Sequence, residues 1–394
     1  MMKKESIIAS FARTPIGSFQ GALSSVPAVH LGATVIRELV KRAGIHTEDV
    51  DEVIIGNVLS AGVGQAPARQ AAIYGGLPNK VECMTINKVC GSGLKTVMLA
   101  DQAIRCGDAE VIIAGGMENM SQAPYYLLDV RDGMRMGHKK VIDALIHDGL
   151  WDPYGDMHMG NCAEVLAKEE NYSREEQDSF AVESYRRSME AIKNGSFQDE
   201  IVAVAISQRK GEPIIVDTDE EPGRGKQDKI EKLSPVFDKG GTITAANASS
   251  INDGAAALTV IANDKADELG IHSIGRIIAH SSVAHEPLYF TTAPGKAITK
   301  VLKKSGLTIE DIDLFEINEA FSNVTLAAMR EHSIPHDKVN IHGGAVSLGH
   351  PIGASGARIL VTLISTLQKK QKKRGLVTLC IGGGEAAALI VEII

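Results

Sequence analysis

Short runs of β-branched and other apolar residues alternate with longer amphipathic segments along much of the chain. Val53 to Ile55 and Val111 to Ala114 have the length and composition of buried strands. A segment with helical periodicity follows Gln65 and lies between them. Strands that alternate with helices are typical of a sheet covered by helices on both faces. We therefore predict an α/β fold, and we expect its strands to run parallel.

The pattern occurs twice in the chain. KRAGIHTEDVDEVIIGNVLS at 41 to 60 aligns without gaps with KKSGLTIEDIDLFEINEAFS at 303 to 322. Both segments have the signature of a helix end, a glycine stop, an acidic turn and a strand. We interpret them as parts of two copies of one α/β unit that pack against each other. An interface between such units is a favoured place for a ligand site, so we expect the site there.

The residues between the two copies differ in composition. They contain the single Trp, most of the tyrosines and a charged stretch, DTDEEPGRGKQDKIEK. Ser173, followed by Glu176 and, further on, Gly195, predicts one helix with a capping box and a glycine stop. We predict an inserted loop subdomain. The expected boundaries are an N-terminal half at 1–117, the inserted subdomain at 118–248, a return to the N-terminal half at 249–271 and a C-terminal half at 272–394.

Composition excludes several classes of protein. The 41 basic and 49 acidic residues give a net charge of −8, which does not favour binding to nucleic acid. The apolar runs are far shorter than the ~20 residues that cross a bilayer, so we expect no membrane span. Five cysteines, an odd number, favour free thiols in a reducing compartment. Because the N-terminus has no secretory pattern, we expect a cytoplasmic protein.

Familiar cofactor and hydrolase motifs are missing from the sequence. It contains no GxGxxG, GxxxxGK[ST], GxSxG or HExxH pattern. His342, His350 and Cys380 do not have the paired spacing of zinc ligands, and we expect no metal site. Thiol chemistry remains the best-supported class.

Cys90 is the strongest candidate nucleophile. It follows a short predicted strand, Met84 to Ile86, and precedes GSGLKTVMLADQAIRC, which has the pattern of a helix stopped by Gly107. A helix N-terminus lowers the pKa of a thiol, so we expect an ionised Cys90. The residues alone leave open that Cys90 is a small buried packing residue. Packing is the expected role of Cys83, Cys106 and Cys162.

A nucleophilic cysteine usually borrows a histidine from elsewhere in the fold. His350 occupies nearly the repeat-equivalent place of Cys90, just before another predicted helix, and is the best candidate base. Cys380 closes the predicted strand LVTLC and precedes glycines whose N–H groups can hold an oxyanion, but a structural role stays open. Asn318 can orient a water or simply form a turn.

Together these residues resemble the thiolase family over nearly the whole chain. The motifs that carry the resemblance are GNVLSAGVGQAPARQAA, NKVCGSGLK, GGMENMS, HMGNCAE, NASSINDGAAA, NEAF, GGAVSLGHPIGASGAR and CIGGG. The resemblance implies a five-layered αβαβα fold built from two βαβαβαββ repeats plus an inserted loop subdomain. It also implies acyl transfer to and from coenzyme A, with coenzyme A thioesters as substrates and no resident cofactor.

The resemblance assigns roles to the candidates. Cys90 would attack acetyl-CoA and form an acetyl-enzyme while His350 takes its proton. Cys380 would then remove the α-proton of a second acetyl-CoA, and the enolate would attack the acetyl group to give acetoacetyl-CoA. Asn318 would hold a water, and the N–H groups of Cys90 and Gly382 would bind the tetrahedral oxyanion. The expected activity is acetyl-CoA C-acetyltransferase, together with the reverse thiolysis.

Other positions match expected substrate contacts. His158 and Met159 resemble the short-chain members of the family, and Ser249 matches a serine that contacts coenzyme A. Arg224 is the nearest match to an arginine expected near the adenine. The aromatic residues expected to wall the pocket are Phe237, Phe290 and Phe321.

Two departures and two alternatives accompany the resemblance. Glu385 stands where glutamine is common in the family, and Ser250 where glycine is common. A degradative 3-ketoacyl-CoA thiolase of broader chain length is the nearest alternative function, and a non-catalytic thiolase-like protein that binds acyl-CoA or lipid is another. The family also suggests a homotetramer, a dimer of dimers in which the loop after Ser121 makes the second contact.

Overall fold

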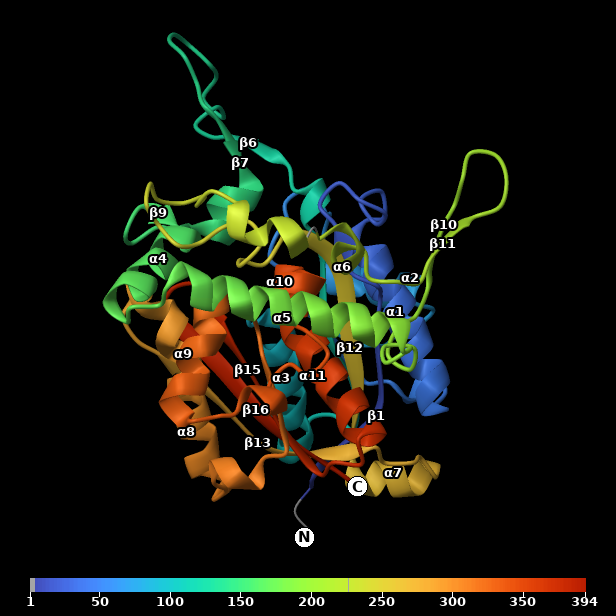
Figure 1. The fold of residues 1–394 in the computed structure, drawn as a ribbon. Helices are drawn as coiled ribbons and strands as arrows, with labels where there is room; N and C mark the ends of the chain where they lie inside the picture. Colours follow the sequence, from blue (N-terminus) through green and yellow to red (C-terminus); the bar gives the residue numbers. More distant parts are fainter. Residues whose placement is uncertain (1–3, 226) are drawn as a thin grey trace.

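The computed structural model of the chain describes residues 4–225 and 227–394 (Figure 1). The first half contains β1 (Ser6–Arg13), β2 (Gly17–Ser18), α1 (Ala28–Ala43), β3 (Glu52–Gly56), α2 (Pro67–Tyr74), β4 (Glu82–Ile86), α3 (Ser92–Cys106), β5 (Val111–Asn119) and β12 (Asn252–Ala262). The second half contains β13 (Gly275–Ala284), α8 (Ala293–Ser305), β14 (Leu314–Ile317), α9 (Ser322–His332), α10 (Ala345–Leu348), α11 (Ile352–Lys369), β15 (Arg374–Ile381) and β16 (Glu385–Ile393). Helix α7 (Asn263–Leu269) connects the halves.

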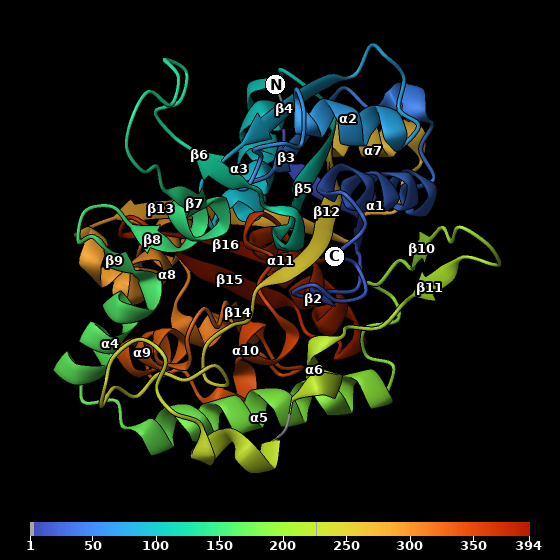
Figure 2. The ribbon, with the colours of Figure 1, turned by 90° about the horizontal axis from the view of Figure 1, so that it is seen from above.

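A long segment between β5 and β12 carries the remaining elements. They are β6 (Tyr125–Leu127), β7 (Val141–Asp143), the π-helix η3 (Leu145–Leu150), β8 (Trp151–Asp152), β9 (Met157–His158), α4 (Met159–Glu169), α5 (Arg174–Lys193), β10 (Val204–Ile206), β11 (Ile214–Val216) and α6 (Glu221–Arg224). Figure 2 shows α5 on the outside of the second half, beside α10. The hairpins β6–β7 and β10–β11 project from the body of the molecule (Figure 1).

The strands form one mixed sheet in the order β14-β15-β16-β13-β1-β12-β5-β3-β4, with β2 paired to β12. Strands β1 and β13 join the two halves through two residue pairs, Ile7 with Arg276 and Ile8 with Gly275. The expectation of parallel strands holds for β3 with β4, β3 with β5, and β14 with β15. It is wrong for the strands in the middle, which pair antiparallel. A tight hairpin turn joins β15 to β16, and such turns produce antiparallel pairs.

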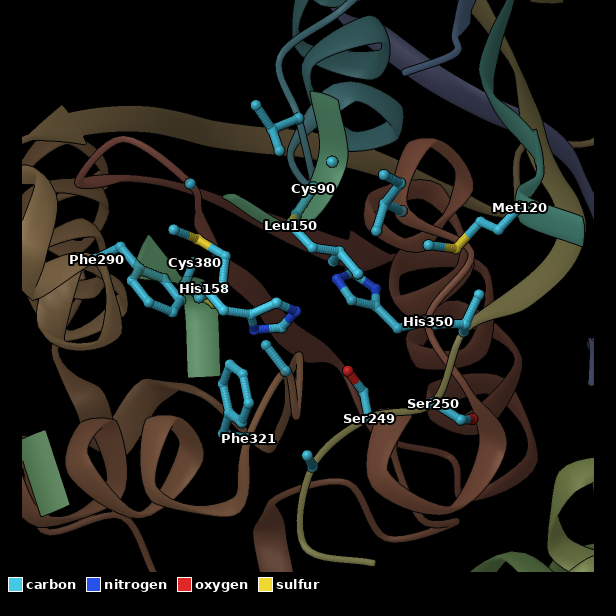
Figure 3. Close-up of a pocket in the computed structure, with 18 of the residues that line it drawn as sticks. Cys90, Met120, Leu150, His158, Ser249, Ser250, Phe290, Phe321, His350 and Cys380 are labelled. Carbon is cyan, nitrogen blue, oxygen red and sulfur yellow. The ribbon is translucent and has the colours of Figure 1, made fainter. Parts of the chain in front are cut away.

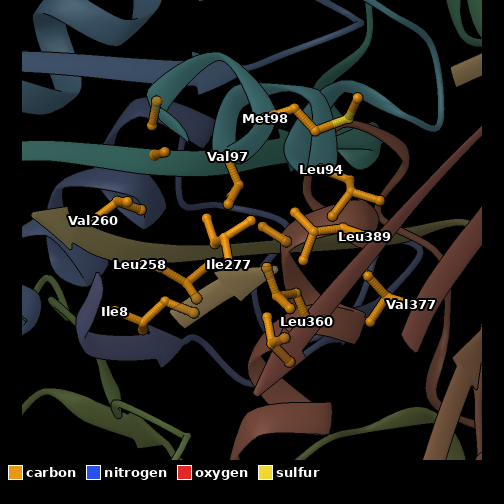
Figure 4. Close-up of a cluster of buried hydrophobic side chains, with 14 of the residues drawn as sticks. Ile8, Leu94, Val97, Met98, Leu258, Val260, Ile277, Leu360, Val377 and Leu389 are labelled. Atoms are coloured by element: carbon orange, nitrogen blue, oxygen red, sulfur yellow. The ribbon is translucent and has the colours of Figure 1, made fainter. Parts of the chain in front are cut away.

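Alternating side chains divide the core into three layers of packing. Ile54 and Ile112 belong to the cluster that packs around α3 and α11, between the two halves of the sheet. Figure 4 shows Leu94 and Val97 of α3 and Leu360 of α11 within this cluster. Val53 and Val111, the neighbours of Ile54 and Ile112 in the sequence, point to the opposite face, where α1 and α2 cover the first half. In the second half, the outer face packs on α8 and α9. This period-two alternation gives the order helix, sheet, helix, sheet, helix, which is the five-layered arrangement expected from the resemblance.

The two halves share details of their turns. Helices α1 and α8 end at Gly44 and Gly306, which both adopt left-handed backbone with φ of 68° and 73°. Short 3-10 turns with capping boxes follow at Thr47–Asp49 and Ile309–Asp311, ahead of β3 and β14. The copies also differ, because the strand that corresponds to β4 is reduced to one bridge, Phe315 with Val339, in the described part of the second half.

The elements predicted from the hydrophobic pattern are confirmed within one or two residues at most ends. Helix α5 begins after Ser173, whose hydroxyl accepts the N–H of Glu176 at 3.1 Å, and Gly195 just beyond it has a φ of 68°. Helix α3 ends at Gly107 as expected. None of the helices in the described ranges is long and apolar enough to span a bilayer.

Candidate active site

One cavity of about 250 Å³ lies where the two halves meet. Ten of the predicted site residues line it: Cys90, His158, Met159, Phe237, Ser249, Phe290, Phe321, His350, Cys380 and Gly382. Figure 3 shows Cys90, Cys380 and His350 around this cavity. They come from the start of α3, the end of β15 and the turn before α11, so both halves contribute to the site.

The turn that carries Cys90 is held by local hydrogen bonds. The Asn87 side chain accepts the N–H of Val89 at 2.9 Å, and the Ser92 hydroxyl accepts the N–H of Lys88 at 2.8 Å and donates to the carbonyl of Val89 at 2.7 Å. Val89 has a φ of 45°, which is unfavourable for a β-branched residue. The hydrogen bonds of the turn therefore hold Val89 in an unfavourable backbone conformation, immediately before Cys90.

His350 is oriented as a proton acceptor. Its ring is buried, and Nδ1 lies 2.6 Å from the Ser355 hydroxyl. That hydroxyl donates to the carbonyl of Pro351 at 2.9 Å, so its lone pair accepts the Nδ1 proton. The neutral ring then carries a lone pair at Nε2, which has no hydrogen-bond partner among the described residues. Burial, aided by Arg358, lowers the pKa of His350 to about 3 and keeps the ring neutral.

The expectation of an ionised Cys90 is wrong for this structure. The residue is partly exposed to the cavity, but burial raises the pKa of the Cys90 thiol to about 11. Hydrogen bonds from the N–H groups of Gly382 and of Cys90 itself act in the opposite direction and do not compensate. A helix N-terminus contributes about 0.3–1 kcal/mol, less than one pKa unit, whereas burial can shift a pKa by ~3–5 units. Desolvation therefore dominates, and the resting pair is a thiol and a neutral imidazole.

Cys380 lies deeper than Cys90. It is 1% exposed and packs in an apolar cluster that includes Phe290 and Phe321. Burial and the neighbouring Cys90 raise the pKa of Cys380 well above its ordinary value. The two sulfurs thus face one cavity in different surroundings.

His158 is held with the opposite proton arrangement to His350. Its Nδ1 accepts the N–H of Gly160 at 3.0 Å as the cap of α4, so the proton of the neutral ring is on Nε2. Burial lowers the pKa of His158. The ring stacks on Phe237 with centroids 4.8 Å apart, and a side chain at Gly160 would collide with that phenyl ring. The cavity therefore contains one imidazole oriented as a donor and one as an acceptor.

Two predicted residues do not line the cavity. Asn318 is 1% exposed, its N–H donates to the carbonyl of Thr378 at 3.0 Å, and neither side-chain polar atom has a partner among the described residues. A buried amide without protein partners is a place for an ordered water. Arg224 lies on α6 with an exposed side chain that pairs with Glu220 at 3.3 Å. Its role near the adenine remains a prediction.

The structure adds residues that the sequence reasoning missed. Glu118 is fully buried and accepts four N–H donors: Asn57 Nδ2 at 2.7 Å and the backbone of Val58 at 3.0 Å, Leu59 at 3.1 Å and Gly353 at 2.9 Å. It ties the start of α11 to the first half, while burial raises its pKa to about 7. Its place in GGMENMS was the only signal in the sequence.

Asn252 and the π-helix η3 were also missed. Asn252 Oδ1 accepts the N–H of His350 at 2.8 Å, which fixes the backbone of the turn. Gly149 and Leu150 of η3 line the cavity. π-helices occur preferentially at functional sites. The sequence LIHDGL has no feature that predicts a π-helix. Other lining residues that were not predicted are Val89, Met120, Ala248, Ser250, Ile251, Ala320 and Ile352.

The described residues contain no cluster of three or more His, Cys, Asp or Glu side chains arranged to hold a metal ion. The chemistry that the cavity supports is that of a thiol beside a neutral base, with a second buried thiol and backbone N–H donors at the same place.

Comparison with known proteins agrees with this arrangement. Residues 6–264 match the model "Thiolase, N-terminal domain" and residues 271–393 match "Thiolase, C-terminal domain". An acetyl-CoA acetyltransferase of Pseudomonas aeruginosa is 52% identical over 384 residues, covering 97% of this chain and 98% of that protein.

Solved structures extend the similarity to the fold. A Bacillus anthracis acetyl-CoA acetyltransferase superposes with a TM-score of 0.97 at 39% identity, covering 100% of this chain and 99% of that one. The Acat5 thiolase of Ascaris suum in complex with coenzyme A has a TM-score of 0.94 at 42% identity, covering 99% of this chain and 100% of that one. Both domains and nearly every residue of the chain are thus matched, and the chain belongs to the thiolase family.

Proposed function

We propose that this protein is an acetyl-CoA C-acetyltransferase, which condenses two acetyl-CoA molecules to acetoacetyl-CoA and free coenzyme A and catalyses the reverse thiolysis. The observation that carries the proposal is the meeting of Cys90, Cys380 and His350 in one cavity at the interface of the halves. The relatives named above bear the same activity in their names. Coenzyme A thioesters are the substrates, and the proposed reaction uses no resident cofactor.

In the first step the Cys90 sulfur attacks the carbonyl carbon of acetyl-CoA. Nε2 of His350 takes the thiol proton as the carbon–sulfur bond forms, because the free thiol and the neutral imidazole are both uncharged at rest. The N–H groups of Cys90 and Gly382 stabilise the developing oxyanion. The bond between the carbonyl carbon and the sulfur of coenzyme A breaks, and the leaving thiolate receives the proton from His350.

In the second step another acetyl-CoA enters and Cys380 removes a proton from its α-carbon. The Cys380 thiol first gives its own proton to Nε2 of His350, and the resulting thiolate is a strong base because the pKa of Cys380 is raised. The α-carbon attacks the acetyl carbonyl on Cys90, and the bond to the Cys90 sulfur breaks to release acetoacetyl-CoA. The departing Cys90 thiolate takes the proton from His350, which returns all three groups to their resting state. The Nε2–H of His158 is available as a donor to a substrate carbonyl in this cavity.

A short acyl group fits the dimensions of the site. The cavity of about 250 Å³ is slightly smaller than the ≈ 300–1,000 Å³ typical of ligand pockets. Phe290 is 3% exposed and Phe321 is 7% exposed, and their rings meet edge to face with centroids 6.4 Å apart. Buried aromatic rings at the inner wall leave little room for a long acyl chain.

Two measurements test the proposal. Radiolabelled acetyl-CoA, added alone, is expected to leave one acetyl group on the protein, and added coenzyme A is expected to remove it. Thiolysis rates for 3-ketoacyl-CoA substrates of increasing chain length are expected to fall steeply beyond acetoacetyl-CoA. Equal rates across the series would instead identify the broader 3-ketoacyl-CoA thiolase, and an absence of labelling would favour a non-catalytic acyl-CoA-binding protein.

We also propose a homotetramer. The hairpin β6–β7 carries exposed apolar side chains, with Tyr125 66%, Met136 97% and Val141 64% exposed. A projecting hairpin with this surface is suited to a second copy of the chain. Sedimentation of the full chain is expected to give four subunits, and removal of the three apolar side chains is expected to give dimers.

A further inference from the structure

An ion pair connects the two halves of the molecule beside the catalytic cavity. Lys88 lies two residues before Cys90, and its ammonium group pairs with the carboxylate of Glu385 at the start of β16. The side chains are 23% and 35% exposed, so the pair is partly shielded from solvent. Neither residue lines the cavity.

The pair joins two turns that already touch. A side chain at Gly91 would collide with Ile381, which shows how closely the Cys90 turn approaches the end of β15. Gly382 lies on the same cavity as Cys90, and its N–H acts to lower the pKa of the Cys90 thiol. Glu385 stands directly opposite Ile381 in the hairpin, with Gly382, Gly383 and Gly384 between them.

The glycine turn has little rigidity of its own. Gly383 and Gly384 have φ of 90° and 83°, values that glycine adopts at no cost but does not hold strongly. The N–H of Gly382 must nevertheless stay in a fixed position to bind an oxyanion, because misplaced donors lose most of their catalytic effect. Contacts on both sides of the turn are therefore needed to hold it.

A third charge lies near the pair. Lys95, in the first turn of α3, has its pKa lowered by burial and by Lys88, whereas Glu385 raises it. The charge of Glu385 thus acts on two ammonium groups that repel each other. Removal of Glu385 leaves that repulsion uncompensated, whereas removal of Lys88 leaves Lys95 as an alternative partner.

We propose that Lys88 and Glu385 are positioning residues, whose ion pair fixes the glycine turn against the Cys90 turn and so holds the N–H groups of Cys90 and Gly382 in register for the oxyanion of acetyl transfer. The proposal rests on the acetyltransferase function above.

The test compares two reactions of the same sulfur. Acetylation of Cys90 by acetyl-CoA needs the oxyanion site, whereas alkylation by iodoacetamide needs only the sulfur. For Glu385→Ala we expect single-turnover acetylation to fall roughly tenfold, with alkylation changed less than about twofold. This is less than the ~10²–10³ that follows removal of an oxyanion donor, because the donor is misaligned and not lost. The KM for acetyl-CoA is expected to stay within about twofold of the wild-type value, because neither residue contacts the cavity.

Further variants separate charge from packing. Lys88→Met is expected to be milder than Glu385→Ala, since Lys95 remains. The double variant Lys88→Met with Lys95→Met is expected to match Glu385→Ala. Glu385→Gln keeps a hydrogen-bond acceptor of the same shape but removes the charge, and its acetylation rate is expected to lie between those of the wild type and Glu385→Ala. Glu48→Ala, which breaks the exposed pair of Glu48 with Lys80, is the control and is expected to have no effect.

The proposal is overturned if Glu385→Ala lowers acetylation and alkylation by the same factor, or lowers only the melting temperature. It is also overturned if Glu385→Gln is as impaired as Glu385→Ala. If wild-type protein takes no acetyl label while Cys90 is readily alkylated, the acetyltransferase function itself is wrong, so the two failures are distinguishable.

Discussion

Cys90 and His350 occupy equivalent places in the two halves, yet the turns that hold them differ. Both residues immediately precede a helix of the central layer, α3 or α11, and these helices pack against each other. The Cys90 turn is strained at Val89 and partly open to the cavity. The His350 turn is buried and fixed by Ser355 and Asn252. One scaffold thus presents a reactive sulfur on one side and a rigid base on the other.

The comparison shows how a duplicated unit can produce an asymmetric site. Cys90 and His350 have equivalent backbone positions in the two copies, so the packing of α3 against α11 brings them together. Their chemistry is set by a few side chains that the copies do not share: Ser355 selects the tautomer of His350, and desolvation keeps Cys90 protonated. The following predictions test this division, beginning with the largest expected effect.

Cys90→Ser removes the nucleophile from the turn that precedes α3. A serine hydroxyl is a far weaker nucleophile at neutral pH, so we expect turnover to fall about 10³-fold or more. Acetyl labelling from radiolabelled acetyl-CoA should disappear. Cys380→Ser is the matched variant: it should still take the label but fail to condense it. Full thiolysis by Cys90→Ser would contradict the assignment of the nucleophile.

Ser355→Ala tests the hydrogen bond that orients the His350 ring. Without the hydroxyl, Nδ1 of His350 loses its acceptor at 2.6 Å and the ring no longer favours one tautomer. We expect kcat to fall about tenfold, equivalent to one hydrogen bond of ~1.4 kcal/mol, with little change in KM. Ser365→Ala on the same helix is the control, since that hydroxyl has no partner in the described chain. Equal activity of the two variants would show that Ser355 does not orient the base.

Glu118→Gln tests the tie between the halves. In the glutamine side chain an NH₂ group replaces one of the two carboxylate oxygens. Depending on the orientation of the amide, this NH₂ donor faces the N–H donors of Val58 and Gly353 or those of Asn57 and Leu59, so two hydrogen bonds are lost. We expect the free energy of unfolding to fall by about 2–3 kcal/mol, measured by urea denaturation. Glu82→Gln on the exposed side of β4 should leave stability unchanged. A neutral result at Glu118 would mean that its carboxyl group is already protonated in the folded state.

The pH dependence of Cys90 alkylation gives the smallest and most direct test. Because burial raises the pKa of the thiol to about 11, the thiolate fraction and the alkylation rate should keep rising through pH 9 and 10. The raised pKa also means that stability gained from the neutral thiol is present below pH ~9 and is lost as the pH rises toward 11. A rate that reaches its plateau by pH 8 would show that the sulfur is ionised at rest.

Many elements of the fold could be predicted from the sequence because each produces a local pattern of hydrophobic residues. The short apolar runs Val53 to Ile55 and Val111 to Ala114 predicted strands, and the aligned segments at 41 to 60 and 303 to 322 predicted two copies. Strand direction was not accessible, since it depends on pairings between residues that are far apart, such as Ile8 with Val260. Local periodicity contains no information about those partners.

The site was predicted in part for the same reason. The resemblance located Cys90, His350 and Cys380, but the charge state of Cys90 was predicted from one local effect, the helix N-terminus, while burial by distant residues has the larger influence. Glu118 and Asn252 were missed because their functions are to bond backbone groups from other elements. Such roles follow from tertiary contacts and leave no spacing in the sequence.

The pairing of β1 has a consequence for how the polypeptide acquires its structure. Ser6 lies beside Ala262 on one edge, and Ile8 lies beside Gly275 on the other. During synthesis, β1 is therefore made well before its sheet neighbours β12 and β13, which follow only after about two thirds of the chain. Closing such long loops is slow, and an unpaired apolar strand is prone to aggregation in the meantime. Refolding of the full chain should consequently be slow and dependent on concentration, with the seam between the halves completed late.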